Sequence, residues 1–246
     1  MRESGRELPD VDDSKAIELR PERRHGYLAL LRVLFKTYPK RSILGASLMI
    51  SQSFLYNSIF FTYTLVLSKF YDVDAEKTPI YLIAFAVGNF IGPLVLGPLF
   101  DSLGRRKMIA GTYIMSGVLL AISGWLFNAG MLTAVTQTVA WCVIFFFASA
   151  GASSAYLTVS EIFPLEVRAM AIAVFFAIAQ SFGALGPVLY GALIGDGSNP
   201  TAPLYGYLLA AAIMVAGGLV EVWLGIDAEN KSLEAVATPL SLAGGG

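Results

Sequence analysis

The sequence predicts an all-α fold, an integral membrane bundle of six helices, and three observations support this. Hydrophobic residues make up 56% of the chain and charged residues only 14%, whereas an ordinary soluble domain carries about 25% charged residues. The apolar residues gather in six runs of about 20 residues or more, the length that crosses a bilayer as a helix. The charges lie apart from these runs, with ten of the seventeen Lys and Arg in residues 1–41.

The six runs divide the chain into a membrane region and two tails. Residues 1–41 predict a cytoplasmic tail whose last part, residues 27–36, is a short amphipathic stretch suited to a membrane surface. Residues 42–226 hold the helices, and residues 227–246 form a second cytoplasmic tail. The predicted helices cover residues 43–70, 79–100, 108–128, 131–158, 169–195 and 204–226.

Lys and Arg near the helix ends predict the orientation, because cations collect on the cytoplasmic side of a membrane. The predicted outer side carries only Lys69 and Lys77. The predicted inner side carries Lys36, Lys40, Arg41, Arg105, Arg106, Lys107, Arg168 and Lys231. We therefore expect both termini in the cytoplasm and the chain in the plasma membrane.

Several functional classes are disfavoured by composition. The single cysteine, Cys142, lies in an apolar run, and the single histidine, His25, lies in the first tail, which predicts no disulfide, no metal site and no cofactor. No nucleophile stands near a base, which disfavours an enzyme. With the cations concentrated in a tail, nothing indicates a nucleic-acid partner.

Small residues at helical spacing predict where helices approach closely. Prolines inside two of the runs, Pro93 and Pro187, predict bends there. The small-residue stripes are Ala84, Gly88 and Gly92 in the second run, and Ala179, Gly183, Pro187, Gly191 and Gly195 in the fifth.

A loop between the second and third runs, residues 97–107, combines two glycines with a burst of charge. Its spacing, Gly-x-x-x-Asp-x-x-Gly-Arg-Arg, is carried by Gly97, Asp101, Gly104, Arg105 and Arg106. Glycine permits a tight reversal, and any short cytoplasmic loop tends to be basic. The full spacing, however, resembles the cytoplasmic signature loop of the major facilitator superfamily of transporters.

Two further segments strengthen this resemblance. Residues 160–168 look like the equivalent loop of the sugar-porter branch, and residues 227–234 are a weak echo of its closing Pro-Glu-Thr-Lys-Gly-x-Ser-Leu-Glu segment. The resemblance implies that the chain is half of a twelve-helix major facilitator fold, the C-terminal half with the central linker. It also implies a partner, a missing N-terminal half of six helices, and transport of a small-molecule solute through the lipid bilayer.

Uncharged polar residues inside the runs are the candidate solute contacts, because polar groups within a membrane mark substrate paths. In the first run Gln52, Tyr56 and Asn57 supply donors and acceptors without charge, and the Gln52–Asn57 spacing is similar to that of sugar porters. Asn89 matches that branch's sugar-contacting asparagine. The alternative is that each amide merely bonds a neighbouring helix.

The fourth run departs from the sugar porters. Where that branch carries prolines and a Trp, this chain has Ser153, Ser154 and Tyr156, and Tyr156 offers an aromatic surface with a polar tip. The fifth run has Gln180 where sugar porters tend to have Asn. These departures widen the expected substrate to a small polar metabolite, with sugars as one class.

Charged residues at the cytoplasmic ends form the second candidate site. The predicted charge network, which closes the cytoplasmic side in the family, has eight members: Gly97, Asp101, Gly104, Arg105, Arg106, Glu161, Glu166 and Arg168. The alternative is that these charges only fix the topology. Apart from them, Glu221 lies within the sixth run, either as an anchor of the helix end or as a proton-coupling group.

Two hypotheses for the function follow from the sequence. The first is a secondary active carrier of a small polar metabolite, a sugar or another organic solute, that is proton-coupled and works by alternating access. The second is a six-helix membrane scaffold or regulatory subunit that transports nothing.

Overall fold

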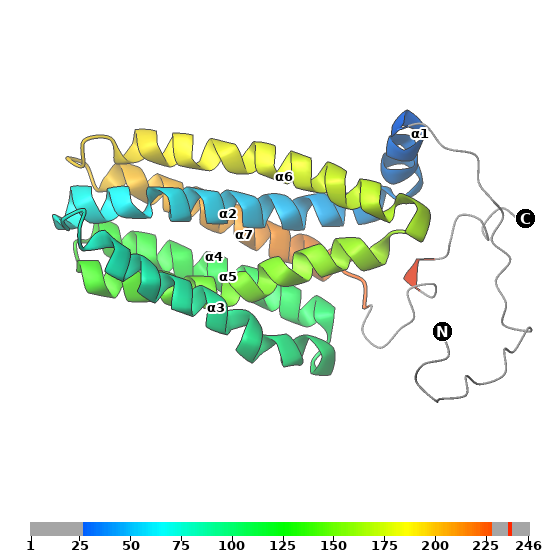
Figure 1. The fold of residues 1–246 in the computed structure, drawn as a ribbon, viewed down its shortest axis with the longest axis horizontal. Coiled ribbons are helices and arrows are strands. Elements are labelled where there is room, and N and C mark those ends of the chain that lie inside the picture. The colour runs from blue at the N-terminus through cyan, green and yellow to red at the C-terminus, as the bar shows by residue number, and fades with distance from the viewer. Residues whose placement is uncertain (1–26, 228–235, 238–246) are drawn as a thin grey trace, which may run out of the picture.

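The computed structural model describes residues 27–227 and 236–237, and all regular structure in these residues is helical (Figure 1). A short helix leads into six long ones of 24 to 33 residues. The elements are α1 Tyr27–Arg32, the π-helical turn η2 Val33–Thr37, α2 Pro39–Tyr71, α3 Thr78–Ser102, α4 Arg105–Asn128, α5 Ala134–Ile162, α6 Leu165–Ile194 and α7 Thr201–Leu224.

All six predicted membrane helices are confirmed as helices long and apolar enough to span a bilayer. Their lengths exceed the roughly 20 residues that cross the hydrocarbon layer. The first begins at Pro39, where proline suits the first turn because its missing N–H is not needed there. The last ends at Leu224, close to the predicted boundary at 226.

Three turns show how the chain reverses between helices. Asp72 ends α2 in a left-handed conformation with φ of 50°. Gly104 precedes α4 with φ of 100°, a region that favours glycine. Thr133 and Thr136 cap α5 reciprocally, each side chain accepting from the backbone N–H of the other. Gly97, which the sequence placed in the α3–α4 loop, lies inside α3, so the reversal falls at residues 103–104.

The helices form an inner group and an outer pair. Over their most apolar stretches, α2 and α5 each have 56% of residues buried, whereas α6 has 22% and α3 only 17%. The most extensive packing joins α4 with α7, α2 with α6 and α3 with α5. Each helix of the outer pair, α3 and α6, thus packs mainly against one inner helix. The outer pair also carries the internal prolines Pro93, Pro98 and Pro187.

Glycines allow the outer helices to approach closely. A side-chain carbon on Gly92 of α3 would collide with the backbone oxygen of Phe146 in α5, and one on Gly183 of α6 would collide with Ser53 of α2. The predicted stripes therefore lie partly at helix contacts. Gly191 departs from this pattern, because nothing lies within 4 Å of the position its side-chain carbon would occupy.

One end of the bundle, here called the basic end, carries Arg41, Arg105, Arg106, Lys107 and Arg168. The predicted amphipathic stretch is helical there, and α1 lies across this end at an angle to the long helices (Figure 1). Leu34 of η2 is fully buried, and Ser42 donates to its carbonyl oxygen at 2.7 Å. The rest of the predicted first tail, His25 included, and Lys231 with most of the 227–234 segment lie outside the described residues.

Candidate solute pocket and charge cluster

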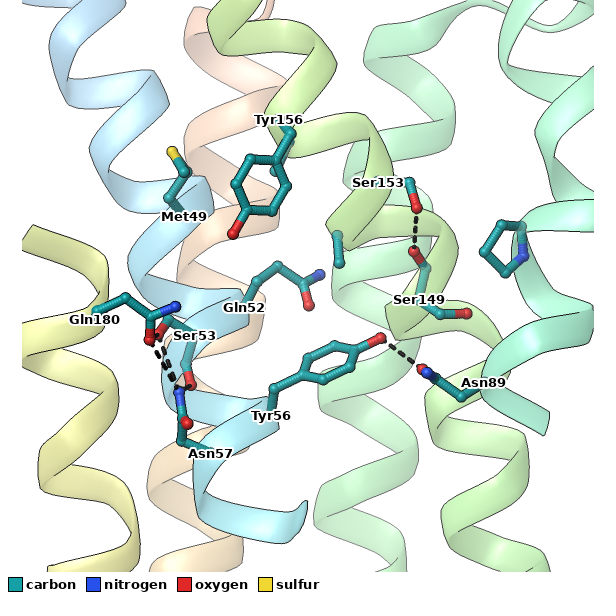
Figure 2. Close-up of a pocket in the computed structure, with 13 residues that line it drawn as sticks. Met49, Gln52, Ser53, Tyr56, Asn57, Asn89, Ser149, Ser153, Tyr156 and Gln180 are labelled. Atoms are coloured by element: carbon teal, nitrogen blue, oxygen red, sulfur yellow. Dashed lines mark hydrogen bonds between the residues drawn. The ribbon is translucent and has the colours of Figure 1, made fainter. Parts of the chain in front are cut away.

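A cavity of about 400 Å³ opens between α2, α3, α5 and α6, near the middle of these helices (Figure 2). All five predicted solute contacts, from three helices, line it. These five residues are Gln52, Tyr56, Asn57, Asn89 and Tyr156. The other lining residues are Met49, Ser53, Pro93, Ser149, Ala152, Ser153, Ala155 and Gln180.

Helices α2 and α5 each supply five of the lining residues, because residues three or four apart along a helix fall on one face. Tyr56 extends from α2 towards α3, where its hydroxyl donates to Oδ1 of Asn89 at 2.8 Å (Figure 2). The Tyr56 ring also packs edge-on against Phe145 of α5, with centroids 4.8 Å apart. Tyr56 is therefore held in place, and the hydrogen-bonding capacity of Asn89 is partly used.

A second polar contact joins α2 to α6 across the pocket. The Ser53 hydroxyl donates to Oε1 of Gln180 at 3.1 Å, and the Asn57 amide lies 3.5 Å from the same oxygen. Asn57 also donates to the Ser53 carbonyl oxygen at 2.8 Å. These contacts use Oε1 of Gln180. The residue is exposed, and its NH₂ group lies at the pocket wall.

Gln52 differs from its neighbours because neither amide atom makes a hydrogen bond of normal geometry to the described residues, although the residue is only 5% exposed. The polar group beside it is the hydroxyl of Tyr113, which donates to the carbonyl oxygen of Leu48. Nε2 of Gln52 lies against Gly151 of α5, 3.0 Å from the position a side-chain carbon there would occupy. Burying an amide without a partner costs roughly 1–3 kcal/mol. A solute that occupied the pocket would supply the missing partner.

The residues lining the pocket carry no charge. They offer amides, hydroxyls, phenols and one thioether, so hydrogen bonding, not charge pairing, is the chemistry available. Tyr156 is 45% exposed and packs against Phe176 of α6, which leaves its ring open to the cavity. No group of three or more metal-ligating side chains occurs in the described part of the chain.

Four polar lining residues were not among the predicted solute contacts: Ser53, Ser149, Ser153 and Gln180. Ser149 and Ser153 lie one turn apart on α5, and Ser153 donates to the Ser149 carbonyl oxygen at 3.1 Å. Their positions seven and three residues before the predicted Tyr156, on one face of the helix, were the available signal. The sequence also indicated Gln180 as a pocket residue, since it stands where sugar porters tend to have Asn.

The predicted charge network is partly assembled at the basic end. Arg105, which opens α4, forms an ion pair with Glu161 at the end of α5, and its guanidinium lies 3.6 Å from Oδ1 of Asp101 in α3. Arg105 and Glu161 are largely buried, with 21% and 16% of their side chains exposed. One cation thus links the ends of α3, α4 and α5.

The other charged members of the predicted network make different contacts. Arg106 donates to the carbonyl oxygen of Val222 in α7, and Arg168 lies 3.4 Å from the carbonyl oxygen of Phe163. Glu166 occupies the first turn of α6, where the helix dipole favours an acid. Two of the predicted cations therefore satisfy backbone groups at helix ends.

Glu221 of α7 is fully buried, and neither carboxyl oxygen has a hydrogen-bond partner among the described residues. It lies towards the basic end, one turn from Gly225 and close to the side chain of Arg106. It does not line the pocket, so it is separate from the solute contacts.

Comparison with known proteins places this architecture in a family. Over residues 5–239 the chain matches the family model described as sugar (and other) transporter. It is 30% identical over 171 residues to a citrate-proton symporter from Salmonella typhi, covering 65% of this chain and 38% of that protein. It is 31% identical over 116 residues to an MFS-type efflux pump from Trichophyton rubrum, covering 46% of this chain and 18% of that protein.

The chain thus spans well under half the length of these two relatives. Its six helices agree with a six-helix half of the fold, and the matched region includes all the long helices. The chain belongs to the sugar (and other) transporter family of the major facilitator superfamily.

Proposed function

We propose that this chain is one half of a secondary active carrier that binds a small polar metabolite in the pocket between α2, α3, α5 and α6. One observation carries the proposal: the buried amide of Gln52 reaches into this cavity without a partner, beside four other polar residues expected to contact solute. A purely structural amide would be satisfied by the protein itself. An unsatisfied amide in a cavity suits a ligand that comes and goes.

The lining chemistry supports an uncharged, hydroxyl-rich or amide-like solute, such as a sugar or another polar organic molecule. Citrate, the substrate named for one relative, is an anion that would require cationic partners. None of the residues lining the pocket in this half is cationic. The same relative is a proton symporter, which favours proton coupling here as well.

The open side of the pocket favours a six-helix partner that covers it. Ser153, Tyr156 and Gln180 are exposed on this side, between the outer helices α3 and α6. Hydrocarbon tails cannot hydrogen-bond such groups. A second half packed here would enclose the solute between two bundles, as alternating access requires.

The Arg105–Glu161 pair and Asp101 serve, in this proposal, as a latch at the cytoplasmic side that opens in each cycle. The latch joins α3, α4 and α5 at the basic end of the bundle. Asp101→Asn removes one partner of an exposed contact and leaves the Arg105–Glu161 pair. We expect this variant to reach the membrane at wild-type levels and to transport more slowly; wild-type uptake would exclude Asp101 from the latch.

The central experiment is uptake of a solute panel into vesicles that contain this chain with a six-helix partner half. Gln52→Leu, Asn57→Leu and Asn89→Leu should each reduce uptake of the solute that the wild type carries. Thr64→Leu, an exposed position of α2 away from the pocket, is the matched control. If all three pocket variants keep wild-type flux, the pocket is not the solute site and a scaffold or regulatory subunit becomes the better explanation.

Orientation has its own test, because both termini are proposed to be cytoplasmic in the plasma membrane. A cysteine at the exposed Lys107 position, in a Cys142→Ser background, should react with an impermeant maleimide only after the cells are opened. A cysteine at Lys77, at the opposite end, should react in intact cells. The reverse pattern would invert the proposed topology.

A further inference from the structure

Glu221 is a buried carboxyl group that the proposed solute site does not use. It lies on the face of α7 that packs against α4 and α2, and none of its surface is exposed. Both of its oxygens lack hydrogen-bond partners among the described residues. A buried charge needs a partner that neutralises and hydrogen-bonds it, and the geometry around Glu221 supplies no such bond.

The groups that face Glu221 are few. Helix α4 presents Arg106 and Tyr113, and Asp227 follows α7. The Ser51 hydroxyl of α2 lies one turn away, against Gly217, and donates to backbone carbonyl oxygens. Arg106 is the one cation among these groups, and its guanidinium donates to the carbonyl oxygen of Val222. The Tyr113 hydroxyl is likewise engaged, since it donates to the carbonyl oxygen of Leu48 at 3.0 Å.

Arg106 is nevertheless close enough to respond to Glu221. Its Cγ lies 2.7 Å from the position that a side-chain carbon on Gly225 would occupy, and Glu221 Oε1 lies 2.6 Å from the same position. A long arginine side chain can move its guanidinium between two acceptors on one helix. An ionised Glu221 would compete with the Val222 carbonyl oxygen for it, whereas a protonated Glu221 would not.

Arg106 directly follows Arg105, the centre of the latch. Both residues belong to the first turn of α4, and they reach to different helices, α5 for Arg105 and α7 for Arg106. A movement of Arg106 towards Glu221 would pull on the same turn that holds the Arg105–Glu161 pair. Arg106 and the first turn of α4 therefore connect Glu221 with the Arg105–Glu161 pair at the basic end.

A second route leads from Glu221 to the pocket. One turn above it, Gly217 lies against Ser51 Oγ and the Tyr113 ring. The Tyr113 ring in turn lies beside Gln52 Nε2, since both are 3.0 Å from the side-chain carbon position at Gly151. Buried groups of α2, α4 and α7 thus connect Glu221 with the unpartnered amide of Gln52.

We propose that Glu221 is a proton-binding site whose occupancy controls the latch through Arg106. The Glu221 carboxyl group holds one proton in the present arrangement. When the basic end opens, that proton passes to water, the carboxylate attracts Arg106 away from Val222, and the α4 turn that carries Arg105 is displaced. Binding of a proton from the other side restores the present contacts. This inference rests on the proposed carrier function.

Infrared difference spectroscopy of the full chain in lipid vesicles tests the proton directly. At neutral pH, the spectrum of the wild type minus that of Glu221→Gln should contain the C=O stretch of a protonated carboxylic acid. Asp196→Asn is the matched control, because Ser198 donates to Asp196 through its hydroxyl at 2.7 Å and its N–H at 3.0 Å. These bonds hold the pKa of Asp196 below its ordinary value, so its carboxyl group is ionised and adds no such band.

The result that overturns the proposal is an absent band in the Glu221→Gln difference, which would mean that Glu221 is ionised. This measurement needs no transport, so it stands even if the carrier function fails. Solute exchange by the chain with its partner half separates the two ideas. No exchange by the wild type would defeat the carrier function, whereas exchange whose pH dependence is the same in the wild type and in Glu221→Gln would defeat the control of the latch by Glu221.

Discussion

The two buried glutamines of this bundle lie in regions that treat an amide in opposite ways. Gln137 of α5, near the end opposite the basic end, is fully buried and bonded at both amide atoms. Its Nε2 donates to Ser123 at 3.2 Å and its Oε1 accepts from Tyr71 at 3.3 Å. Gln52, also buried, has no partner in the described residues. Gln137 ties α2, α4 and α5 together, whereas Gln52 leaves its hydrogen bonds for something else.

This contrast distinguishes a buried amide that the protein itself bonds from a buried amide that it does not bond. A buried amide bonded on both sides stabilises its position, and removing it leaves its partners unsatisfied. A buried amide without partners destabilises the fold, and a bound ligand that hydrogen-bonds the amide removes this cost. The two glutamines therefore make opposite predictions for the same substitution.

The largest effect is expected for Gln137→Leu. Loss of this amide leaves the Ser123 and Tyr71 hydroxyls without their bonds, which should lower the free energy of unfolding by roughly 1–3 kcal/mol. Solute affinity of the folded protein should not change, because Gln137 does not line the pocket. Thermal unfolding in mild detergent measures the first quantity and solute binding the second. A fully stable variant would show that these bonds contribute little.

Gln52→Leu should show the reverse pattern. Leucine has a similar volume and no unsatisfied polar atoms, so thermal stability should be equal to or above that of the wild type. Solute affinity should fall by about tenfold for each lost hydrogen bond of about 1.4 kcal/mol. Loss of stability without loss of affinity would place Gln52 with Gln137, as a structural amide.

Tyr56 is intermediate between the two glutamines, because it lines the pocket and is also hydrogen-bonded within the protein. Tyr56→Phe tests this case. Its hydroxyl bonds Asn89 within the pocket, so the variant should lose about 0.5–1.5 kcal/mol of stability. Asn89 then becomes free for solute, and we expect a gain in affinity of no more than about tenfold. Equilibrium binding compares the two proteins. Weaker binding would mean that the Tyr56 hydroxyl itself contacts the solute.

The smallest effect is expected outside the membrane, at the exposed pair Asp74 and Lys77, whose charged atoms are 2.9 Å apart. Bonding to Asp74 raises the pKa of Lys77 above its ordinary value of 10.5. Stability from this pair is thus present at neutral pH and is lost only as the pH rises through the raised pKa. Asp74→Asn should barely shift the melting temperature at neutral pH, because solvent screens the pair. A large shift would show that this turn is more tightly coupled to the bundle.

The sequence was sufficient for the helices and for much of the pocket. Runs of apolar residues located all six spans, since length alone identifies a membrane helix. Gln52, Tyr56 and Asn57 share a segment of α2, and their spacing already placed them together. Asn89 joined them through family resemblance, which supplied the packing of α3 that spacing within one helix cannot. Tyr156 was predicted where the chain departs from the family, from its aromatic ring and polar tip.

Contacts between helices were beyond the sequence. Nothing in the chain says that Gln137 meets Tyr71, 66 residues away, while Gln52 meets no partner. Arg106 and Arg168 were visible as cations, but their acceptors are backbone carbonyl oxygens, which every residue carries and no sequence pattern marks. Gln180 was noted as a departure from the family, and only the packing of α6 on α2 brings it to Ser53.

Helix α2 has 33 residues, no internal proline and a rise of about 1.5 Å per residue, so it is roughly 50 Å long against roughly 30 Å of hydrocarbon. Its first turn, with Lys40 and Arg41, accordingly reaches the level of lipid headgroups when the polar pocket sits at mid-depth. The helix that carries Gln52 and Tyr56 of the pocket thus extends, as one unbroken segment of backbone, from the pocket to the level of the headgroups.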